Sequence, residues 1–206
     1  MSGPISWSQA GSGTCGSQLF SHGVSSNLVH SSPANGRYFK LEAIRHLEQN
    51  AQPKPCKLCA RFVTAAIARG FRVIGDEQHS MGINAGTSIK RITDLALRVC
   101  DQTLADSHLI QFAKNYGFLL EHLGFRKALT VKMDMSGKIP DEAKKAGNIA
   151  VFQPPPSCAE KPGHIQMYTG KKWISDFRQA SDLPTTRPTS PWRTEALDYI
   201  VYSPPN

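Results

Sequence analysis

The stretch CKLCARFVTAAIARG, residues 56–70, decides the fold that we expect for this chain. Pro53 and Pro55 separate it from a shorter amphipathic helix predicted over 39–49, and Gly70 is typical of the position just beyond a helix C-terminus. Between them, apolar side chains recur at the spacing of one helix face. That face comprises Leu58, Phe62, Ala65 or Ala66, and Ala68 or Arg69. The sequence therefore predicts a helix that opens at a Cys-x-x-Cys pair and ends at Gly70.

Beyond Gly70, the hydrophobic pattern predicts two further helices, followed by the strands of a sheet. Helical spacing continues over 88–100 and 107–123, which together make a helical block over 88–123. After Ala146 the pattern changes to short apolar or alternating runs that are typical of strands. These runs are GNIAVFQP (147–154), HIQMY (164–168), KKWISDF (171–177) and a terminal candidate over 199–202. Helices followed by a mainly antiparallel sheet indicate an α+β fold.

The N-terminus differs from the rest of the chain. No Asp, Glu, Lys or Arg occurs before Arg37, and Ser and Gly are dense there. Such a stretch gains little from burial, so we expect an N-terminal segment over 1–37 that is mobile or lies over the body. One folded domain is expected over 38–206, which suits a chain of 206 residues.

Composition narrows the class of protein. With 40% hydrophobic and 19% charged residues, the chain is typical of a globular protein, which excludes collagen, coiled coil and general disorder. No apolar run is long enough to span a bilayer, and no secretory signal peptide is recognisable. The net charge of +8 favours an anionic partner. Because the basic residues are scattered and not interleaved with aromatic ones, we expect neither nucleic-acid binding nor membrane insertion.

Cys59 is the residue best placed to act as a nucleophile. It lies in the first turn of the predicted helix, where unpaired N–H groups and the helix dipole favour a thiolate, and Lys57 and Arg61 add positive charge. Of the seven histidines, His164 begins a predicted strand directly after a Pro-Gly turn. A histidine that faces a helix-start cysteine can accept the thiol proton and later protonate a leaving amine.

An imidazole in that role needs a polar group that orients its other nitrogen. We expect Asp176 to be this group, provided that 169–171 forms a three-residue hairpin connection, because His164 and Asp176 then share one face. A connection of two or four residues would turn Asp176 to the other face. Asn148 and Gln153 are weaker candidates for polar support or oxyanion donation.

Cys56 leaves other chemistries open, because 56–59 is a Cys-x-x-Cys motif and the total of five cysteines is odd. Thioredoxin-type chemistry requires the motif at a strand-to-helix turn, and the Pro-rich lead-in argues against that. Zinc would need a second ligand pair, which does not follow. A further hypothesis is that Cys56 is a redox partner of Cys59, with a disulfide that masks the nucleophile until it is reduced.

Two regions resemble peptidoglycan hydrolases of the NlpC and CHAP types, most closely the type VI secretion amidase effectors. The run LCARFV (58–63) and its alanine-rich helix are similar to the nucleophile helix of that superfamily. AGNIAVFQ (146–153) and GHIQMYTGKKWISDF (163–177) are similar to its later strands, in the same order. The resemblance covers 55–70 and 146–179. Asn148 departs from it, because the superfamily usually has Asp there.

The resemblance implies a papain-like fold and hydrolysis of an amide bond in the peptidoglycan stem peptide, commonly the γ-D-Glu to diaminopimelate link. It assigns nucleophilic attack to Cys59, the base and acid role to His164 and the orienting role to Asp176. The backbone N–H of Cys59 would help to stabilise the oxyanion, and no metal or cofactor is needed. It also implies an antibacterial effector delivered to the target-cell periplasm without a signal peptide, and an immunity protein that covers the Cys59–His164 groove.

Three alternatives remain at the level of the sequence. A phage-type lysin would use the same chemistry in another setting. An inactive wall-binding or interaction module would keep the papain-like fold without catalysis. A thiol protease or transferase acting on host proteins would use the same residues on a different substrate.

Overall fold

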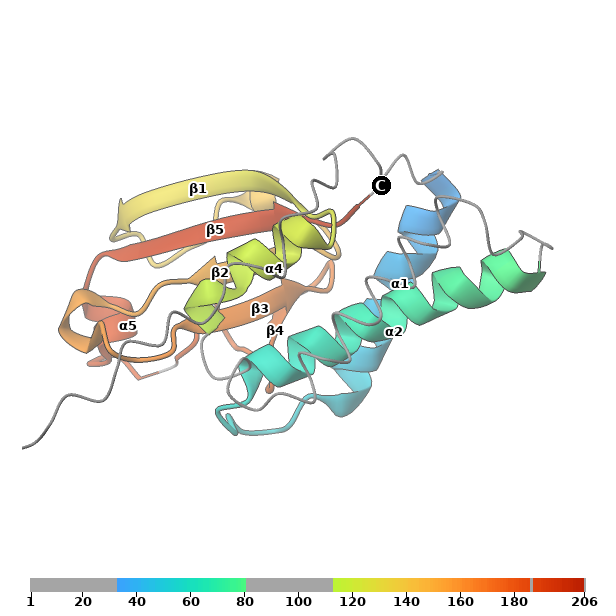
Figure 1. Ribbon diagram of the computed structural model, residues 1–206. Helices are drawn as coiled ribbons and strands as arrows, with labels where there is room; N and C mark the ends of the chain where they lie inside the picture. The colour runs from blue at the N-terminus through green and yellow to red at the C-terminus, as the bar shows by residue number, and fades with distance from the viewer. Residues whose placement is uncertain (1–32, 81–112, 186, 206) are drawn as a thin grey trace, which may run out of the picture.

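The computed structural model describes residues 33–80, 113–185 and 187–205 (Figure 1). The predicted segment 1–37 lies almost entirely outside these residues. The same is true of the predicted helix over 88–100 and of the first part of the helix over 107–123. Of the helical block over 88–123, the described part is a 3-10 turn, η2 (Ala113–Asn115), and helix α4 (Tyr116–His122).

A five-stranded antiparallel sheet forms the centre of the domain, with the strand order β1-β5-β2-β3-β4. The four strands predicted after Ala146 are confirmed, and the terminal one, β5, lies between β1 and β2. The strand β1 was not predicted, because most of its residues are exposed and basic residues interrupt its alternation. The strands are β1 (Arg126–Asp134), β2 (Ile149–Phe152), β3 (His164–Tyr168), β4 (Trp173–Ile174) and β5 (Leu197–Ser203).

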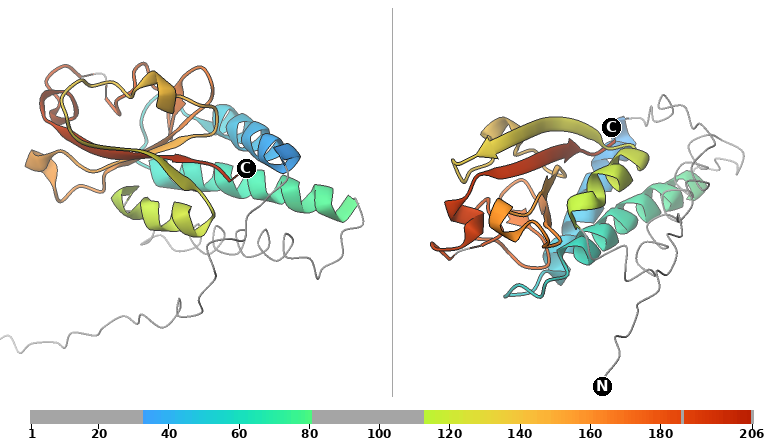
Figure 2. Two further views of the ribbon diagram at one scale, coloured as in Figure 1. Left: turned by 90° about the horizontal axis from the view of Figure 1, so that it is seen from above. Right: turned by 60° about the vertical axis from the view of Figure 1, so that its left-hand side comes forward.

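Helices cover one face of this sheet (Figures 1 and 2). Helix α2 (Cys59–Ser80) packs against β3, and α1 (Pro33–Asn50) packs against α2. The sheet residues beneath them alternate along the strands, as the pleat requires. They are Ile149, Val151, Ile165, Met167, Ile174 and Tyr202. The predicted α+β fold is confirmed, and its Cys59 helix lies on a mainly antiparallel sheet, as expected for a papain-like fold.

The predicted end of the long helix at Gly70 is wrong, since α2 continues to Ser80. Gly70 serves helix packing instead: a Cβ there would lie 2.6 Å from Cδ2 of the Phe39 ring and 3.0 Å from the Phe39 carbonyl oxygen. The predicted buried face is confirmed at Ala66 and Ala68, but Leu58 is 44% exposed. Ala60, Val63, Ile67 and Phe71 form the centre of the buried face.

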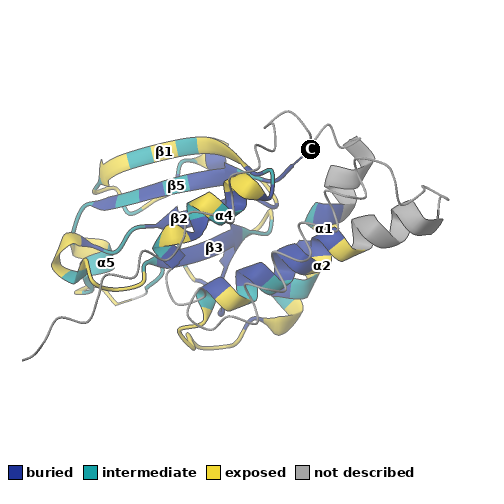
Figure 3. Ribbon diagram, viewed as in Figure 1, coloured by how far each residue is buried: buried dark blue, intermediate teal, exposed yellow. Residues whose placement is uncertain are grey.

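The opposite face of the sheet carries a second core, which loops and a short helix cover. Helix α5 (Pro191–Thr194) and two 3-10 turns, η3 (Asp141–Ala143) and η4 (Pro156–Cys158), lie in these connections. Burial of both faces explains why β2 reads as an uninterrupted apolar run (Figure 3). The second core contains Ile139, Ala143, Ala150, Phe152, Trp173, Leu183, Leu197, Tyr199 and Val201. In the described ranges, no helix is long and apolar enough to cross a membrane.

Gly163 sets the entry into β3. Its φ of +77° lies in the left-handed region, and a Cβ would approach the Phe152 carbonyl oxygen to 2.5 Å. The β2 backbone therefore closes over this turn and fixes where His164 begins the strand.

We expect Gly163→Ala to lower the free energy of unfolding by about 1–3 kcal/mol more than Gly170→Ala does. Both glycines have positive φ, but a Cβ at Gly170 would meet nothing nearer than 3.6 Å, so the difference isolates the collision with β2. Urea unfolding of the two variants measures it. If both variants lose the same free energy of unfolding, then the positive φ of Gly163, and not its close packing against β2, is the reason that a glycine is needed there.

Candidate active site

Cys59 is the first residue of α2 and lies against the start of β3. The backbone N–H of Ile165 lies near enough to favour its thiolate, and the side chain packs against the main core while the residue stays partly exposed. Ile165 directly follows His164, so Cys59 lies at the end of the strand that His164 begins. The pairing of the thiol with the imidazole stays a prediction.

His164 is a buried side chain with polar neighbours. Its Nε2 lies 2.9 Å from Nε2 of Gln179, and the Gln166 side chain lies near enough to raise the pKa of the imidazole against burial. The ring of Trp192 meets the imidazole edge-on, with 6.4 Å between ring centroids. Gln179 is itself buried and lies 3.4 Å from the Ser175 hydroxyl. The imidazole is thus held on several sides by side chains that exclude water.

Asp176 forms its hydrogen bonds elsewhere. The hairpin connection between β3 and β4 has four residues, because Tyr168 pairs with Trp173, so the three-residue connection on which the Asp176 prediction depended is wrong. The Asp176 carboxylate accepts hydrogen bonds from the backbone N–H groups of Cys56 at 2.8 Å and Leu58 at 3.2 Å. The side chain therefore secures the turn before Cys59, and only its charge reaches His164.

The carboxylate in this position stays ionised. Burial tends to raise the pKa of Asp176, but hydrogen bonds from Cys56, Leu58 and Ser175 outweigh it and hold the pKa below its ordinary value. The turn that it secures contains Lys57, whose φ of +66° is rare for a residue with a side chain. A buried anion thus compensates a strained backbone immediately before the helix.

The thiol and the imidazole are both neutral at rest. Burial raises the pKa of Cys59 to about 11, and the charge of Asp176 adds to the rise against the hydrogen bond from Ile165. Burial lowers the pKa of His164 to about 4, although Asp176 and Gln166 oppose this. A thiolate was expected from the helix start, but desolvation is the larger effect here.

The other residues considered from the sequence do not contact this pair. Asn148 donates from Nδ2 to the Ala143 carbonyl oxygen, and Gln153 donates from Nε2 to that of Lys114. Cys56 is exposed, and its thiol is free, as are those of Cys59 and Cys158. Cys15 and Cys100 lie outside the described residues.

Gln179 is the polar residue at this site that the sequence did not reveal. It lies beyond β4, where the chain turns back and pairs with that strand through the Ile174–Arg178 bridge, a tight turn that the sequence pattern did not predict. Within the described part of the chain, no group of three or more His, Cys, Asp or Glu side chains could hold a metal ion.

Comparison with known proteins gives one distant likeness. No protein-family model matches the chain, and no curated protein matches it. Among solved structures, the native type VI effector–immunity complex Tae3–Tai3 from Ralstonia pickettii is 24% identical, with 80% of this chain and 98% of that chain covered and a TM-score of 0.46. The selenomethionine form of the same complex is 24% identical, with coverages of 79% and 99% and a TM-score of 0.45.

We expect Asp176→Ala to lower the free energy of unfolding by about 2–4 kcal/mol, because it leaves two backbone N–H groups without their acceptor. Asp198→Ala is the matched control. Its carboxylate also binds one backbone N–H, that of Met133, and the Lys132 ammonium, but it is 31% exposed, so we expect a loss below about 1 kcal/mol. Thermal and urea unfolding measure both. Similar losses would contradict the anchoring role of Asp176.

The neutral pair predicts how Cys59 reacts with iodoacetamide. With a thiol pKa of about 11, the rate should rise about tenfold per pH unit from pH 6 to pH 9, because only the thiolate reacts. Mass spectrometry of the Cys59 peptide follows this cysteine separately from the others, and free cysteine is the reference. A rate that is already constant between pH 5 and pH 8 would instead reveal a preformed thiolate–imidazolium pair.

Proposed function

We propose that this protein is a cysteine hydrolase that cleaves an amide bond in the stem peptide of bacterial peptidoglycan. The observation that supports the proposal is that the Cys59 thiol, at the start of α2, lies near the backbone N–H of Ile165, the residue that follows His164. The two segments that meet there, 55–70 and 146–179, are the ones that resemble peptidoglycan amidases in sequence. Geometry and resemblance thus favour the same pair of residues.

In the proposed reaction, Cys59 attacks the amide carbonyl while His164 takes the thiol proton. The carbonyl oxygen becomes an oxyanion, which the backbone N–H of Cys59 stabilises at the start of α2. His164 then gives its proton to the leaving amine, and a thioester remains on Cys59. Water, deprotonated by His164, hydrolyses the thioester, so the thiol is restored and the acid is released.

Gln179 sets which nitrogen of His164 is basic. When its amide presents Oε1 to the ring, Nε2–H of His164 donates to it, and Nδ1 is the nitrogen that takes the thiol proton. This orientation also gives a partner to Oε1, a buried atom that otherwise lacks one. We assign Gln179 as the residue that positions the imidazole, the role expected of Asp176. Asp176 supports the site by holding the turn before Cys59.

The neutral resting pair shapes this mechanism. Since His164 has a pKa of about 4, it is free to accept a proton throughout the neutral range. Because the thiol pKa is about 11, the proton must leave during the attack rather than before it. Substrate binding therefore has to bring the carbonyl close enough for both transfers to occur together.

The sequence resemblance extends the proposal to the biological setting. The bond is the one that the resemblance implies, commonly the γ-D-Glu to diaminopimelate link, and the protein acts as an antibacterial effector in the periplasm of a target cell. An immunity protein in the producing cell would cover Cys59 and His164. The net charge of +8 favours adhesion to the anionic wall.

Incubation of the purified, reduced protein with isolated Gram-negative sacculi tests the proposal. Mass analysis of the released muropeptides should show cleaved stem peptides with the unaltered protein. We expect Cys59→Ala and His164→Ala to lose more than about a thousandfold in rate, because each removes a group that reacts.

Cys158→Ala is the control, since it removes another free thiol and should leave the rate unchanged. Sacculi that stay intact but retain the protein on sedimentation would favour the wall-binding module. Intact sacculi together with cleavage of unrelated peptides would favour a protease.

A further inference from the structure

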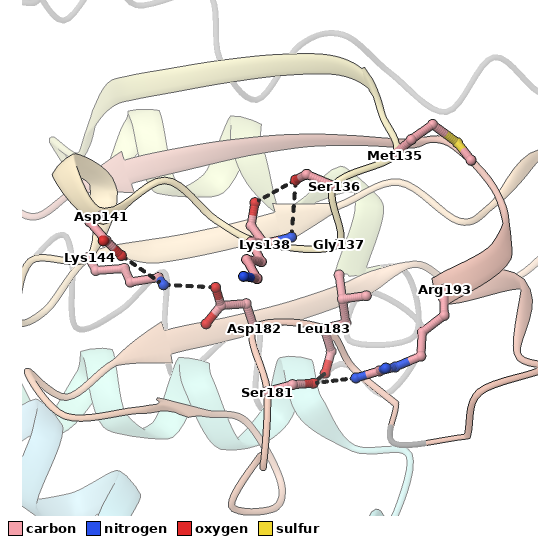
Figure 4. A pocket seen from close by; sticks show the side chains of 10 residues that line it. All are labelled: Met135, Ser136, Gly137, Lys138, Asp141, Lys144, Ser181, Asp182, Leu183 and Arg193. Atoms are coloured by element: carbon pink, nitrogen blue, oxygen red, sulfur yellow. Dashed lines mark hydrogen bonds and ion pairs between the residues drawn. The ribbon is translucent and has the colours of Figure 1, made fainter.

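A cavity opens on the face of the sheet opposite α2 (Figure 4). Its volume of about 530 Å³ is that of a small-ligand site. Three segments form its walls: the connection that follows β1, residues 181–183, and Arg193 of α5. Neither Cys59 nor His164 lines it, so the steps proposed above assign no role to the residues of this cavity.

The charges in the cavity leave a positive surplus. Lys144 is neutralised, because its ammonium lies 3.0 Å from Asp141 and 2.9 Å from Asp182. No carboxylate among the described residues pairs with Lys138 or Arg193, which also line the cavity. The net lining is therefore cationic.

Arg193 is held loosely. Its Nη2 donates to the Ser181 hydroxyl and its Nε to the Thr185 carbonyl oxygen, both at 3.4 Å. Bonds of that length to neutral oxygens are weak. A guanidinium so placed can exchange them for a charge-assisted pair of hydrogen bonds to a carboxylate, which are roughly twice as strong as neutral ones.

The cavity adjoins the imidazole through three short connections. Arg193 directly follows Trp192, whose ring meets that of His164. Ser181 lies two residues beyond Gln179 along the chain. On β3, the Gln166 side chain donates from Nε2 to the Asp182 carbonyl oxygen at 2.8 Å. A peptide whose scissile bond lies at His164 can thus extend a branch toward this cavity.

We infer that this cavity binds a free carboxylate of the substrate peptide, with Arg193 and Lys138 as the groups that bind it. The inference rests on the proposed function. A γ-linked glutamate keeps its α-carboxylate free, and a diaminopimelate keeps the carboxylate at the end of its side chain, so a stem peptide supplies the anion within a few bonds of the linked amide. Asp141 and Asp182 lie at the same cavity and disfavour a dianion such as phosphate, whereas one carboxylate leaves the charges balanced.

Two stem peptides that differ only in one carboxylate, free or amidated, test the inference. We expect the unaltered protein to cleave the free form at least about tenfold faster in kcat/KM. Arg193→Gln and Lys138→Met should each reduce that preference and leave the amidated peptide unaffected. Lys172→Met, which removes an exposed lysine outside the cavity, is the control for net charge.

Binding to the Cys59→Ala protein separates this inference from the proposed function. Calorimetry should show tighter binding of the free carboxylate form, and a second substitution, Arg193→Gln, should remove the difference while the melting temperature stays constant. Equal affinity for both peptides would overturn the carboxylate subsite even if the enzyme is active. If the Cys59→Ala protein prefers the free carboxylate form but the unaltered protein cleaves neither peptide, the subsite is upheld and the hydrolase proposal is overturned.

Discussion

The buried carboxylate of Asp176 is the interaction on which the candidate site depends. It joins the end of β4 to the turn before Cys59, parts of the chain more than a hundred residues apart, through bonds to the N–H groups of Cys56 and Leu58. Its own carbonyl oxygen accepts from the backbone N–H of Gln52 at 2.8 Å, so side chain and backbone hold the connection between α1 and α2 at two points. The N–H groups at a helix start lack partners within the helix. Asp176 satisfies one of them, that of Leu58, and so helps to fix where α2 begins.

This anchoring has an electrostatic consequence at the nucleophile. Burial raises the pKa of Cys59 to about 11, and the negative charge of Asp176 near the thiol adds to the rise. The same burial keeps His164 neutral, with a pKa of about 4. In the proposed reaction, the site therefore contributes positioning and not a preformed thiolate. It would hold the thiol, the imidazole and the Gln179 amide in place, so that the proton moves only when a carbonyl arrives.

The sequence located the parts of the site that depend on local structure. Cys59 at a helix start and His164 after a Pro-Gly turn follow from residue patterns within a few positions, and the structure has both. The role of Asp176 depended on a hairpin register, and one additional residue in the connection changes the face. Gln179 reaches His164 only after the chain has turned back along β4 through the Ile174–Arg178 bridge, which no periodicity encodes. The predicted helix end at Gly70 failed for a related reason. A glycine can end a helix or allow a neighbouring ring to pack closely, and only the position of Phe39 in the fold decides between the two.

The pleat of β3 directs the side chains of His164 and Ile165 to opposite faces of the sheet, so a thiol on the α2 side can reach an imidazole of this strand only at the strand end. Ile165 and Met167 face α2, so His164 and Gln166 face the other side of the sheet, where Phe152 and the second core lie. A histidine in the middle of β3 would be separated from the Cys59 helix by the sheet itself. At the first residue, where Gly163 turns the chain, the sheet no longer separates its two faces, and the proposed pairing of the His164 imidazole with the Cys59 thiol would form there. A substrate held in the cavity would therefore approach from the side of the base, and its scissile bond would have to reach the strand end to meet the nucleophile.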